Sequence, residues 1–308
     1  MWGSSKLKDN TSLLTIFTPT YNRASTLGRV HKSLLMQEFD DLTWLIIDDG
    51  STDDTEELVR SFKKVPNPSF NIEYVYQENR GKPACWNRAV AMCESKYFVC
   101  LDSDDELLPG ILKRLFNDEP YIKNIENEPM IVGLRCDAIS SRTQKISAKH
   151  LSDKPIRKSW FYEVSHNKFC GERLDVFKSQ ILKDFVFPVS KDVKFIPESW
   201  MYSSIAKAGY CFVYLPIAIS LFYVWDDVAR LSTSPISKHA EGHYIYRSHL
   251  LSIMPKYVWA LNPIYYLKTL IRFAQTAHLT KKTFAQRLTS SRSLFATCLS
   301  YILQVVRI

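Results

Sequence analysis

The first half of the chain alternates short apolar runs with longer segments of mixed polarity. The apolar runs have the length and the aliphatic or aromatic content of buried β-strands. They are residues 13–18, 44–47, 72–76, 97–101 and 130–134. Short continuous strands separated by helix-length segments are typical of a parallel sheet covered by helices. The pattern predicts an α/β fold with a mainly parallel sheet.

The segments between these runs carry apolar residues at helical spacing. We expect a helix capped by Ser25 or Thr26, and a second helix capped by Asp53. Further helices are expected at residues 82–93 and from Pro109 onward. Because each helix returns the chain to the start of the next strand, the strands would end at one edge of the sheet.

Polar, charged or glycine-containing loops follow four successive strands. Their sequences are TPTYNR (18–23), DDGSTDDT (48–55), QENRGKPACWN (77–87) and LDSDDEL (101–107). In open α/β sheets, ligands bind outside the carboxyl ends of the strands. Four such loops at one edge therefore predict a binding site.

The fourth loop places Asp102, Asp104 and Asp105 within four positions. One interpretation is a polar turn in which an aspartate caps the helix that follows Pro109. That accounts for one or two of the three carboxylates. Since carboxylates this close repel unless a cation offsets their charge, the cluster favours a site for a divalent metal with hard oxygen ligands.

Taken in order, four motifs resemble those of the family 2 inverting glycosyltransferases, which have the GT-A nucleotide-diphospho-sugar transferase fold. The motifs are FTPTYNR, IIDDGSTDDT, NRGKPACWNRA and LDSDDEL. A weaker resemblance continues through residues 169–179, 194–206 and 222–232. The resemblance implies a sheet flanked by helices and a sugar transfer from a nucleotide-diphosphate donor, for which UDP is the expected nucleotide.

The resemblance also implies which residues bind the donor. They are Thr18, Pro19, Tyr21, Arg23, Asp49, Arg80, Lys82, Asp102, Ser103 and Arg230. The Tyr21 ring would stack on the base, or alternatively pack in the protein. Asp49 would accept a hydrogen bond from the uracil imide. Lys82 would lie beside the diphosphate, or alternatively be a solvated residue at a helix start.

The same resemblance implies a Mn²⁺ or Mg²⁺ cofactor. Asp104 would ligate the ion directly, and Asp102 would contact ribose or metal-bound water. Asp105, Trp200 and Glu172 would face the acceptor or the transferred sugar. For Asp105 the alternative is a helix cap, and for Trp200 it is a place in the core.

An inverting transfer needs a base that takes the proton of the acceptor hydroxyl. Glu198, at the start of a helix expected at residues 198–208, is the first candidate, and Glu172 is the second. Each could instead be an ordinary carboxylate at a helix start, where the helix dipole favours it. The family often has a Glu-Asp pair at the first position, whereas this chain has Glu198-Ser199.

The positive charge is concentrated at the end of the chain. We expect a catalytic domain at 1–235, with a nucleotide-binding half at about 11–110 and an acceptor half at about 129–235, and a tail at 236–308. The tail holds ten Lys or Arg residues and one acidic residue, a formal charge of +9. Its aromatic and basic residues suit an anionic membrane surface; the alternative is a helical subdomain packed on the catalytic domain.

Composition narrows the location and the partners of the protein. The seven cysteines have no pairing or metal-ligand spacing, and the first eleven residues do not look like a targeting signal. We expect a cytoplasmic protein, peripheral on the inner face of the cell membrane. No recognised nucleic-acid module is present, so we expect no nucleic-acid partner.

The sequence thus predicts a metal-dependent inverting glycosyltransferase. It would transfer a sugar from a UDP-sugar to a hydroxyl of a glycan or lipid-linked acceptor, in surface polysaccharide biosynthesis. The alternative is a catalytically silent protein of the same fold that binds sugar nucleotides or acts as a membrane scaffold.

Overall fold

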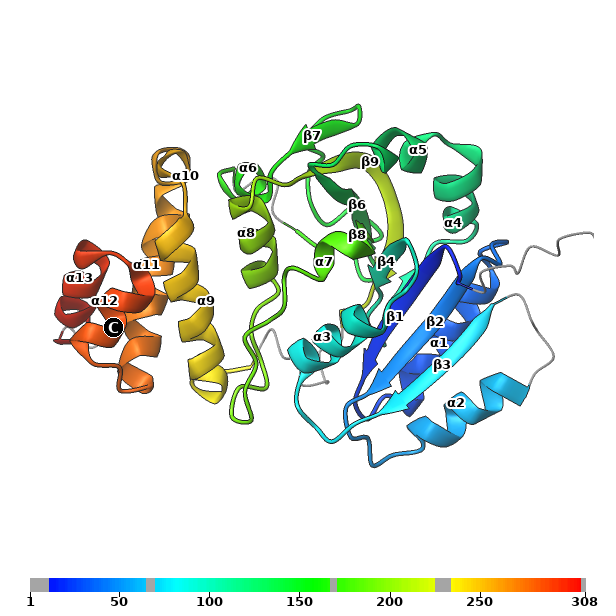
Figure 1. Ribbon diagram of the computed structural model, residues 1–308, viewed down its shortest axis with the longest axis horizontal. Coiled ribbons are helices and arrows are strands. Elements are labelled where there is room, and N and C mark those ends of the chain that lie inside the picture. The colour runs from blue at the N-terminus through cyan, green and yellow to red at the C-terminus, as the bar shows by residue number, and fades with distance from the viewer. Residues whose placement is uncertain (1–10, 65–69, 167–170, 225–233, 306–308) are drawn as a thin grey trace, which may run out of the picture.

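A computed structural model describes residues 11–64, 70–166, 171–224 and 234–305. Over these ranges the strands form one nine-stranded sheet with the order β3-β2-β1-β4-β8-β6-β9-β5, and β7 pairs with β9 (Figure 1). The strands are β1 (Leu14–Thr20), β2 (Leu42–Asp48), β3 (Asn71–Tyr76), β4 (Tyr97–Cys100), β5 (Glu106–Leu107), β6 (Ile131–Ser140), β7 (Ile156–Lys158), β8 (Arg173–Lys178) and β9 (Cys211–Phe222). All five strands expected from the apolar runs are present.

The sheet is parallel where the predicted motifs lie and mixed beyond that point. Strands β1 to β4 are mutually parallel, and β6 pairs in parallel with β9. Strand β8 is antiparallel to both of its neighbours, β4 and β6. The expected α/β sheet flanked by helices is therefore confirmed, with antiparallel pairs in its second half.

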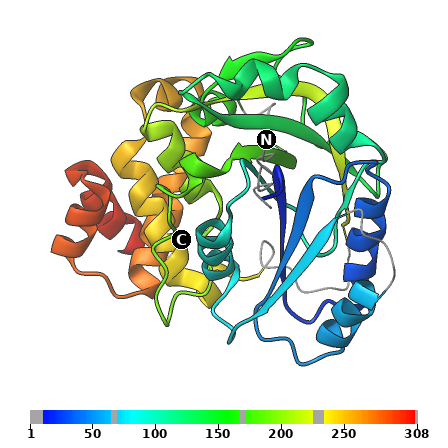
Figure 2. The ribbon, with the colours of Figure 1, turned by 45° about the vertical axis from the view of Figure 1, so that its right-hand side comes forward.

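Helices cover both faces of the sheet (Figure 2). The helices that precede the tail are α1 (Ala24–Leu35), α2 (Thr55–Lys64), α3 (Lys82–Met92), α4 (Ile111–Lys113), the π-helical turn η1 (Arg114–Asp118), α5 (Tyr121–Glu126), α6 (Trp160–Val164), α7 (Ser179–Leu182) and α8 (Ser199–Lys207). Because side chains alternate along a strand, Ile16 packs with α1 and α2 on one face, whereas Phe17 packs with α3 and α8 on the other.

Two predicted details of the helices are wrong. Helix α1 begins at Ala24, so Ser25 and Thr26 lie inside its first turn; the amide of Ala24 instead donates to Asp53 Oδ2 at 3.0 Å. The cap thus comes from the neighbouring loop, which local sequence does not reveal. The helix expected from Pro109 starts at Ile111 as the short α4, and η1 then continues the chain.

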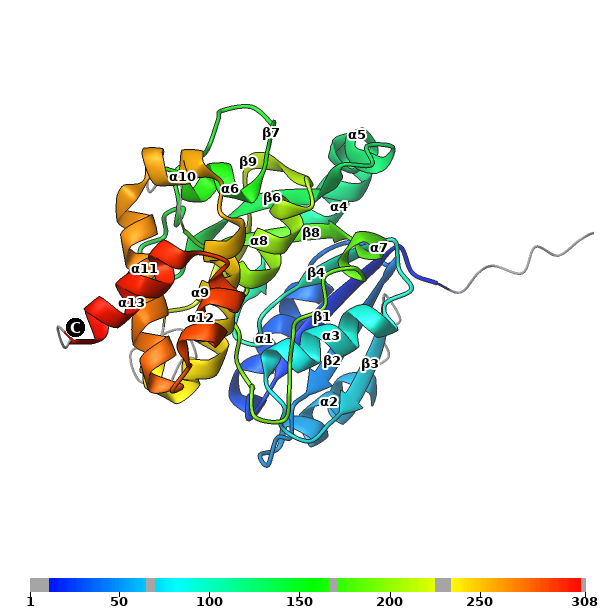
Figure 3. The same cartoon turned by 60° about the vertical axis from the view of Figure 1, so that its left-hand side comes forward.

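The tail forms a group of helices beside the sheet domain (Figures 1 and 3). They are η4 (Ile236–His239), α9 (Ala240–Ile253), α10 (Lys256–Leu261), α11 (Pro263–Leu279), α12 (Phe284–Ser291) and α13 (Leu294–Val305). Tyr246 and Leu250 of α9 join the core around α3 and α8, whereas Tyr244 and Leu251 join a small core with α11 and α13. Helix α9 therefore ties the tail to the sheet. No helix within the described ranges is long and apolar enough to cross a bilayer.

Candidate active site

The four predicted loops leave the sheet at one edge. Thr20 of β1 pairs with Asp48 of β2, which pairs with Tyr76 of β3, so these strands end at the same level. Strand β4 pairs with β1 in parallel and delivers the acidic loop to the same edge. The topology thus brings together segments that lie far apart in the sequence, as the strand pattern predicted.

The acidic loop gathers three carboxylates in a small volume. Asp102, Asp104 and Asp105 each offer a ligand oxygen, and these oxygens lie within 4.8 Å of one another. All three side chains are only partly buried. Their oxygens are therefore both close enough to share a cation and open to a ligand from solvent.

Helix α1 fixes the backbone of this loop. The hydroxyl of Thr26 donates to the carbonyl oxygen of Ser103 at 2.8 Å, and the guanidinium of Arg29 donates to that of Asp104 at 2.8 Å. Arg29 also lies over the ring of Tyr223, 3.8 Å from its centroid. These contacts hold the loop against α1. The sequence led us to expect a helix cap for Thr26 and gave no role to Arg29, and it did not reveal that either residue contacts this loop.

The cluster carries more negative charge than its surroundings compensate. Burial, and then the charges of Asp102 and Asp104, raise the pKa of Asp105 to about 8, although the amide of Tyr223 donates to Asp105 Oδ1 at 3.1 Å and opposes the shift. Neighbouring carboxylates disfavour one another's ionised forms, and a bound cation offsets that repulsion. An all-oxygen set of this kind fits a hard divalent ion such as Mg²⁺ or Mn²⁺.

Lys82 connects the acidic cluster to the candidate base. Its ammonium nitrogen lies 2.7 Å from Asp102 Oδ1 and 2.6 Å from Glu198 Oε1. Burial by itself would lower the pKa of Lys82, but the charges of Asp102 and Glu198 raise it well above the usual lysine value. The structure thus brings the predicted base to the predicted metal site, and the side chains of Asp102 and Glu198 keep 45% and 43% of their surface exposed.

Two close backbone contacts position Glu198. It precedes α8, at the end of a segment that passes between Gly81 and Gly242. A Cβ atom at Gly81 would overlap the carbonyl oxygen of Lys194, and one at Gly242 would overlap that of Phe195. Gly81 also has φ = +88°, which side chains disfavour. Both glycines are thus required by close approach, one from the donor loop and one from α9.

A buried charge network anchors α8 to the sheet. The hydroxyl of Tyr202 in α8 donates to Asp175 Oδ2 at 2.7 Å, and Arg135 of β6 pairs with the same oxygen at 2.5 Å. Arg135 also donates to Glu163 Oε2 at 2.9 Å. Because buried charges are costly when one partner is removed, this network holds α8, and with it Glu198, in one place.

Asp49 organises the turn that precedes Lys82. Its carboxylate accepts hydrogen bonds from the side chain of Gln77 at 2.8 Å and from the amides of Arg80 and Gly81 at 2.8 and 2.7 Å. The residue is almost fully buried. Three donors therefore occupy the oxygens that were expected to meet uracil, and the uracil contact stays a prediction.

The other predicted donor residues of the first loop differ in accessibility. Thr18 is buried, and its hydroxyl accepts a hydrogen bond from the indole of Trp44 at 3.0 Å. Pro19 and Arg23 are partly buried, whereas Tyr21 is exposed and its ring is free to meet a base. The side chain most open for stacking is therefore the one for which stacking was predicted.

The remaining predicted residues differ in burial and packing. Ser103 is buried, and Arg80 has an exposed side chain. Trp200 packs between Phe187 and His249, with ring centroids 5.5 and 5.2 Å away. Glu172 is exposed and precedes strand β8, so it is not at a helix start. Arg230 lies outside the described residues.

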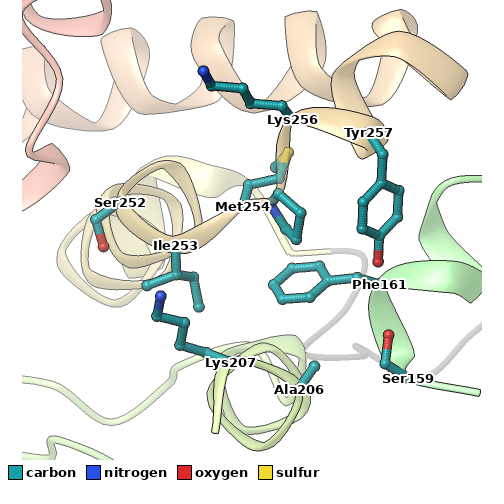
Figure 4. A pocket seen from close by; sticks show the side chains of 10 residues that line it. Ser159, Phe161, Ala206, Lys207, Ser252, Ile253, Met254, Lys256 and Tyr257 are labelled. Carbon is teal, nitrogen blue, oxygen red and sulfur yellow. The ribbon is translucent and has the colours of Figure 1, made fainter. Parts of the chain in front are cut away.

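A cavity of about 520 Å³ lies away from this edge (Figure 4). Phe161, Tyr257 and Lys207 are among the residues that line it. Lys207 is the last residue of α8, so the cavity is at the opposite end of that helix from Glu198. It shares no lining residue with the acidic cluster, and we do not assign it to the chemistry.

The chain is similar to named glycosyltransferases. The model of glycosyl transferase family 2 matches residues 15–184. The GalNAc(5)-diNAcBac-PP-undecaprenol beta-1,3-glucosyltransferase of Campylobacter jejuni is 30% identical over 176 residues, which cover 56% of this chain and 53% of that protein. The poly-beta-1,6-N-acetyl-D-glucosamine synthase of Staphylococcus aureus is 24% identical over 247 residues, 78% of this chain and 57% of that protein. The chain spans little more than half the length of these relatives.

Solved structures share the fold at low sequence identity. Staphylococcus aureus TarS in complex with UDP-GlcNAc has a TM-score of 0.59 and 13% identity, over 91% of this chain and 76% of that one. The mannosyltransferase PcManGT from Pyrobaculum calidifontis, in complex with GDP-Man and Mn²⁺, has a TM-score of 0.54 and 19% identity. The match covers 97% of this chain and 81% of that one. The expected GT-A fold is thereby confirmed. Since the family model also matches more than half of its residues, the chain belongs to glycosyltransferase family 2.

Proposed function

We propose that the protein is a metal-dependent, inverting glycosyltransferase that uses a nucleotide-diphosphate sugar, with UDP as the nucleotide. The observation that carries the proposal is the arrangement of Asp102, Lys82 and Glu198. In it, one ammonium joins the acidic cluster to the carboxylate that precedes helix α8. A purely structural acidic turn would not need a second, half-exposed carboxylate on the same lysine.

Asp102, Asp104 and Asp105 are the residues that would hold Mn²⁺ or Mg²⁺. Their oxygens lie within 4.8 Å of one another, and burial together with the charges of Asp102 and Asp104 raises the pKa of Asp105. A bound ion would supply Lewis-acid stabilisation of the departing diphosphate. Lys82 lies beside this cluster and at the start of α3, where an ammonium and the helix N-terminus both favour a phosphate group.

Glu198 is proposed as the general base. The acceptor hydroxyl loses its proton to the Glu198 carboxylate as its oxygen attacks the anomeric carbon, and the bond from that carbon to the diphosphate oxygen breaks. Attack opposite the leaving group inverts the configuration. The partial exposure of Glu198 leaves room for an acceptor, and its ion pair with Lys82 places it beside the acidic cluster.

The comparisons support the proposed substrates. TarS was solved with UDP-GlcNAc, and the relative from Campylobacter jejuni is named for an undecaprenol-linked acceptor and a β-linked product. We propose a UDP-sugar donor and a glycan or lipid-linked acceptor, in surface polysaccharide biosynthesis. An acceptor of this kind would place the enzyme at the inner face of the cell membrane as a peripheral protein.

A donor screen tests the proposal. The purified protein is incubated with UDP-, GDP- and dTDP-sugars, with and without Mn²⁺, and both the thermal shift and the release of nucleoside diphosphate are measured. We expect Mn²⁺-dependent stabilisation and slow diphosphate release with a UDP-sugar. Stabilisation without any release, also when candidate acceptors are added, would favour a catalytically silent sugar-nucleotide-binding protein. The absence of both effects would contradict the proposal.

A further inference from the structure

The last helix exposes a continuous apolar stripe. Along α13, Leu294, Phe295 and Ile302 are 60%, 62% and 60% exposed. Cys298 and Tyr301 are exposed between them, so the five positions follow the spacing of one helical face. Phe284 of α12 extends the stripe, because its exposed ring lies 5.8 Å from that of Tyr301. We call these six residues the α13 stripe.

The opposite face of α13 provides its packing. Ala296, Thr297 and Ser300 are buried, and Ala296 belongs to the small core that includes Phe273 of α11. In Figures 1 and 3, α13 lies at the outer side of the helical tail, away from the sheet. The stripe therefore faces away from the rest of the described chain, and contiguous exposed apolar surface of this kind marks an interaction site.

Charge indicates the kind of partner. No Asp or Glu occurs anywhere after Glu241, while Lys and Arg recur through the tail. Lys281 is exposed three residues before Phe284, and Arg292 is exposed two residues before Leu294, so bases flank the stripe at both helix starts. On α11, Leu267 and the neighbouring Lys268 are exposed as well.

We propose that the α13 stripe docks on an anionic lipid bilayer, with its apolar side chains in the headgroup–acyl boundary and its flanking bases at lipid phosphates. This combination of apolar stripe and basic flank is what an interfacial helix requires. The inference deepens and rests on the membrane association proposed above, to which it assigns a surface.

Two other occupants fit less well. A second copy of the chain would bring two acid-free basic surfaces together, and like charges oppose that contact. The phosphates of a nucleic acid would pair with the basic side chains. A nucleic acid, however, offers exposed Leu294, Phe295 and Ile302 no partner except unstacked nucleobases. The bilayer satisfies both the apolar and the basic residues.

Vesicle binding by the full chain tests the proposal. Co-sedimentation is measured with vesicles of phosphatidylcholine alone and of phosphatidylcholine with phosphatidylglycerol. We expect at least about tenfold tighter binding to the anionic vesicles, weakened by salt. The variant L294S/F295S/I302S should lose at least about tenfold in affinity. The matched control L35S/M92S/M130S, which removes three exposed apolar side chains outside the tail, should bind like the wild type.

A second pair of measurements keeps the outcomes separate. A polarity-sensitive dye on exposed Cys298 should shift to the blue with anionic vesicles, and the signal of an identically treated Cys298→Ser variant is subtracted to remove the contribution of the other cysteines. Sedimentation velocity without vesicles should show the same mass for the wild type and for the triple variant. Unchanged vesicle binding by the triple variant, an unshifted dye, or a wild-type dimer that the triple variant dissociates would overturn the proposal.

Diphosphate release is recorded in the same samples. Vesicle binding that depends on the α13 stripe, but without turnover, would contradict the proposed enzyme activity and would still support the docking surface. Turnover without vesicle binding would contradict the docking surface alone.

Discussion

Glu198 and Lys82 form an ion pair at 2.6 Å, although they belong to different halves of the sheet domain. The same ammonium contacts Asp102 at 2.7 Å. The proposed base and the proposed metal site therefore share one cation.

Replacing the proposed base should separate binding from chemistry. In Glu198→Gln, shape is kept but the proton acceptor is lost, so we expect sugar transfer to fall by about 10²–10⁴-fold with donor affinity nearly unchanged. Donor affinity is measured by calorimetry and transfer by product formation. Glu172→Gln is the matched control. If Glu172→Gln were the variant that lost transfer, the base would be Glu172 instead.

Removing the bridging ammonium should weaken donor binding. In Lys82→Gln, Asp102 and Glu198 lose a shared partner and the diphosphate loses a cation, so we expect about tenfold weaker donor binding. The control Lys96→Gln removes an exposed ion pair with Glu126 and should have little effect. Equal donor affinity of Lys82→Gln and the wild type would show that Lys82 has no role at the phosphates.

The mutual repulsion of the acidic cluster should lower the stability of the folded protein when no metal is bound. Asp104→Asn removes a negative charge beside Asp102 and Asp105, so we expect it to raise stability in metal-free buffer by about 0.5–1 kcal/mol. The same variant should lose the Mn²⁺-dependent thermal shift with a nucleotide sugar. Melting curves with EDTA and with Mn²⁺ measure both effects. A variant less stable than the wild type in EDTA would mean that Asp104 has a structural role.

Gly242 in α9 should control the position of Glu198. A methyl group there overlaps the carbonyl oxygen of Phe195, so Gly242→Ala should displace the segment that leads to Glu198. We expect transfer to fall more than donor affinity. Gly28→Ala is the control, because nothing lies within 4 Å of the added atom. It should be neutral or stabilising by up to about 1 kcal/mol, since Gly28 is inside helix α1. Equal activity of the two variants would contradict this positioning role.

His249 should make the stability of the protein dependent on pH. Burial between α8 and α9 lowers its pKa to about 4, and its Nε2 lies 2.9 Å from the hydroxyl oxygen of Ser204. The unfolded chain, with a histidine pKa of about 6.5, binds more protons between pH 6.5 and 4, so stability falls as the pH falls. After allowance for solvent screening, we expect about 1–2 kcal/mol from this residue.

The comparison of the wild type with His249→Gln isolates that contribution. Chemical denaturation is measured at pH 7 and pH 4.5 for both proteins, and the carboxylates common to both cancel in the difference. His249→Gln should lose less stability on acidification than the wild type. An identical loss in the two proteins would show that His249 is not the group responsible.

Much of the structure of the donor half could be predicted because it depends on short sequence patterns, each confined to one segment of the chain. Each apolar run became a strand, and the loop with Asp102 and Asp104 was recognisable from the repulsion that its spacing creates. The roles of Thr26 and Arg29 could not be predicted in this way. Both bond to backbone carbonyls of a loop far along the chain, which leaves no pattern in the sequence around them.

The acceptor half was less predictable for a topological reason. Strand β8 inserts between β4 and β6 and runs antiparallel to both, a pairing that local hydrophobicity does not encode. The contact of Lys82 with Glu198 and the close approach of Gly242 to Phe195 likewise join segments that lie far apart in the sequence. Ser25 and Thr26 were wrongly expected to cap α1 because Asp53 reaches the amide of Ala24 from another loop.

The most direct measurement of the central claim is the anomalous difference map of a crystal soaked with Mn²⁺ and UDP. The account predicts a manganese peak within ligand distance of Asp104, with the diphosphate between that peak and Lys82. A map without a peak at Asp102, Asp104 and Asp105, from a crystal in which UDP is bound, would contradict it.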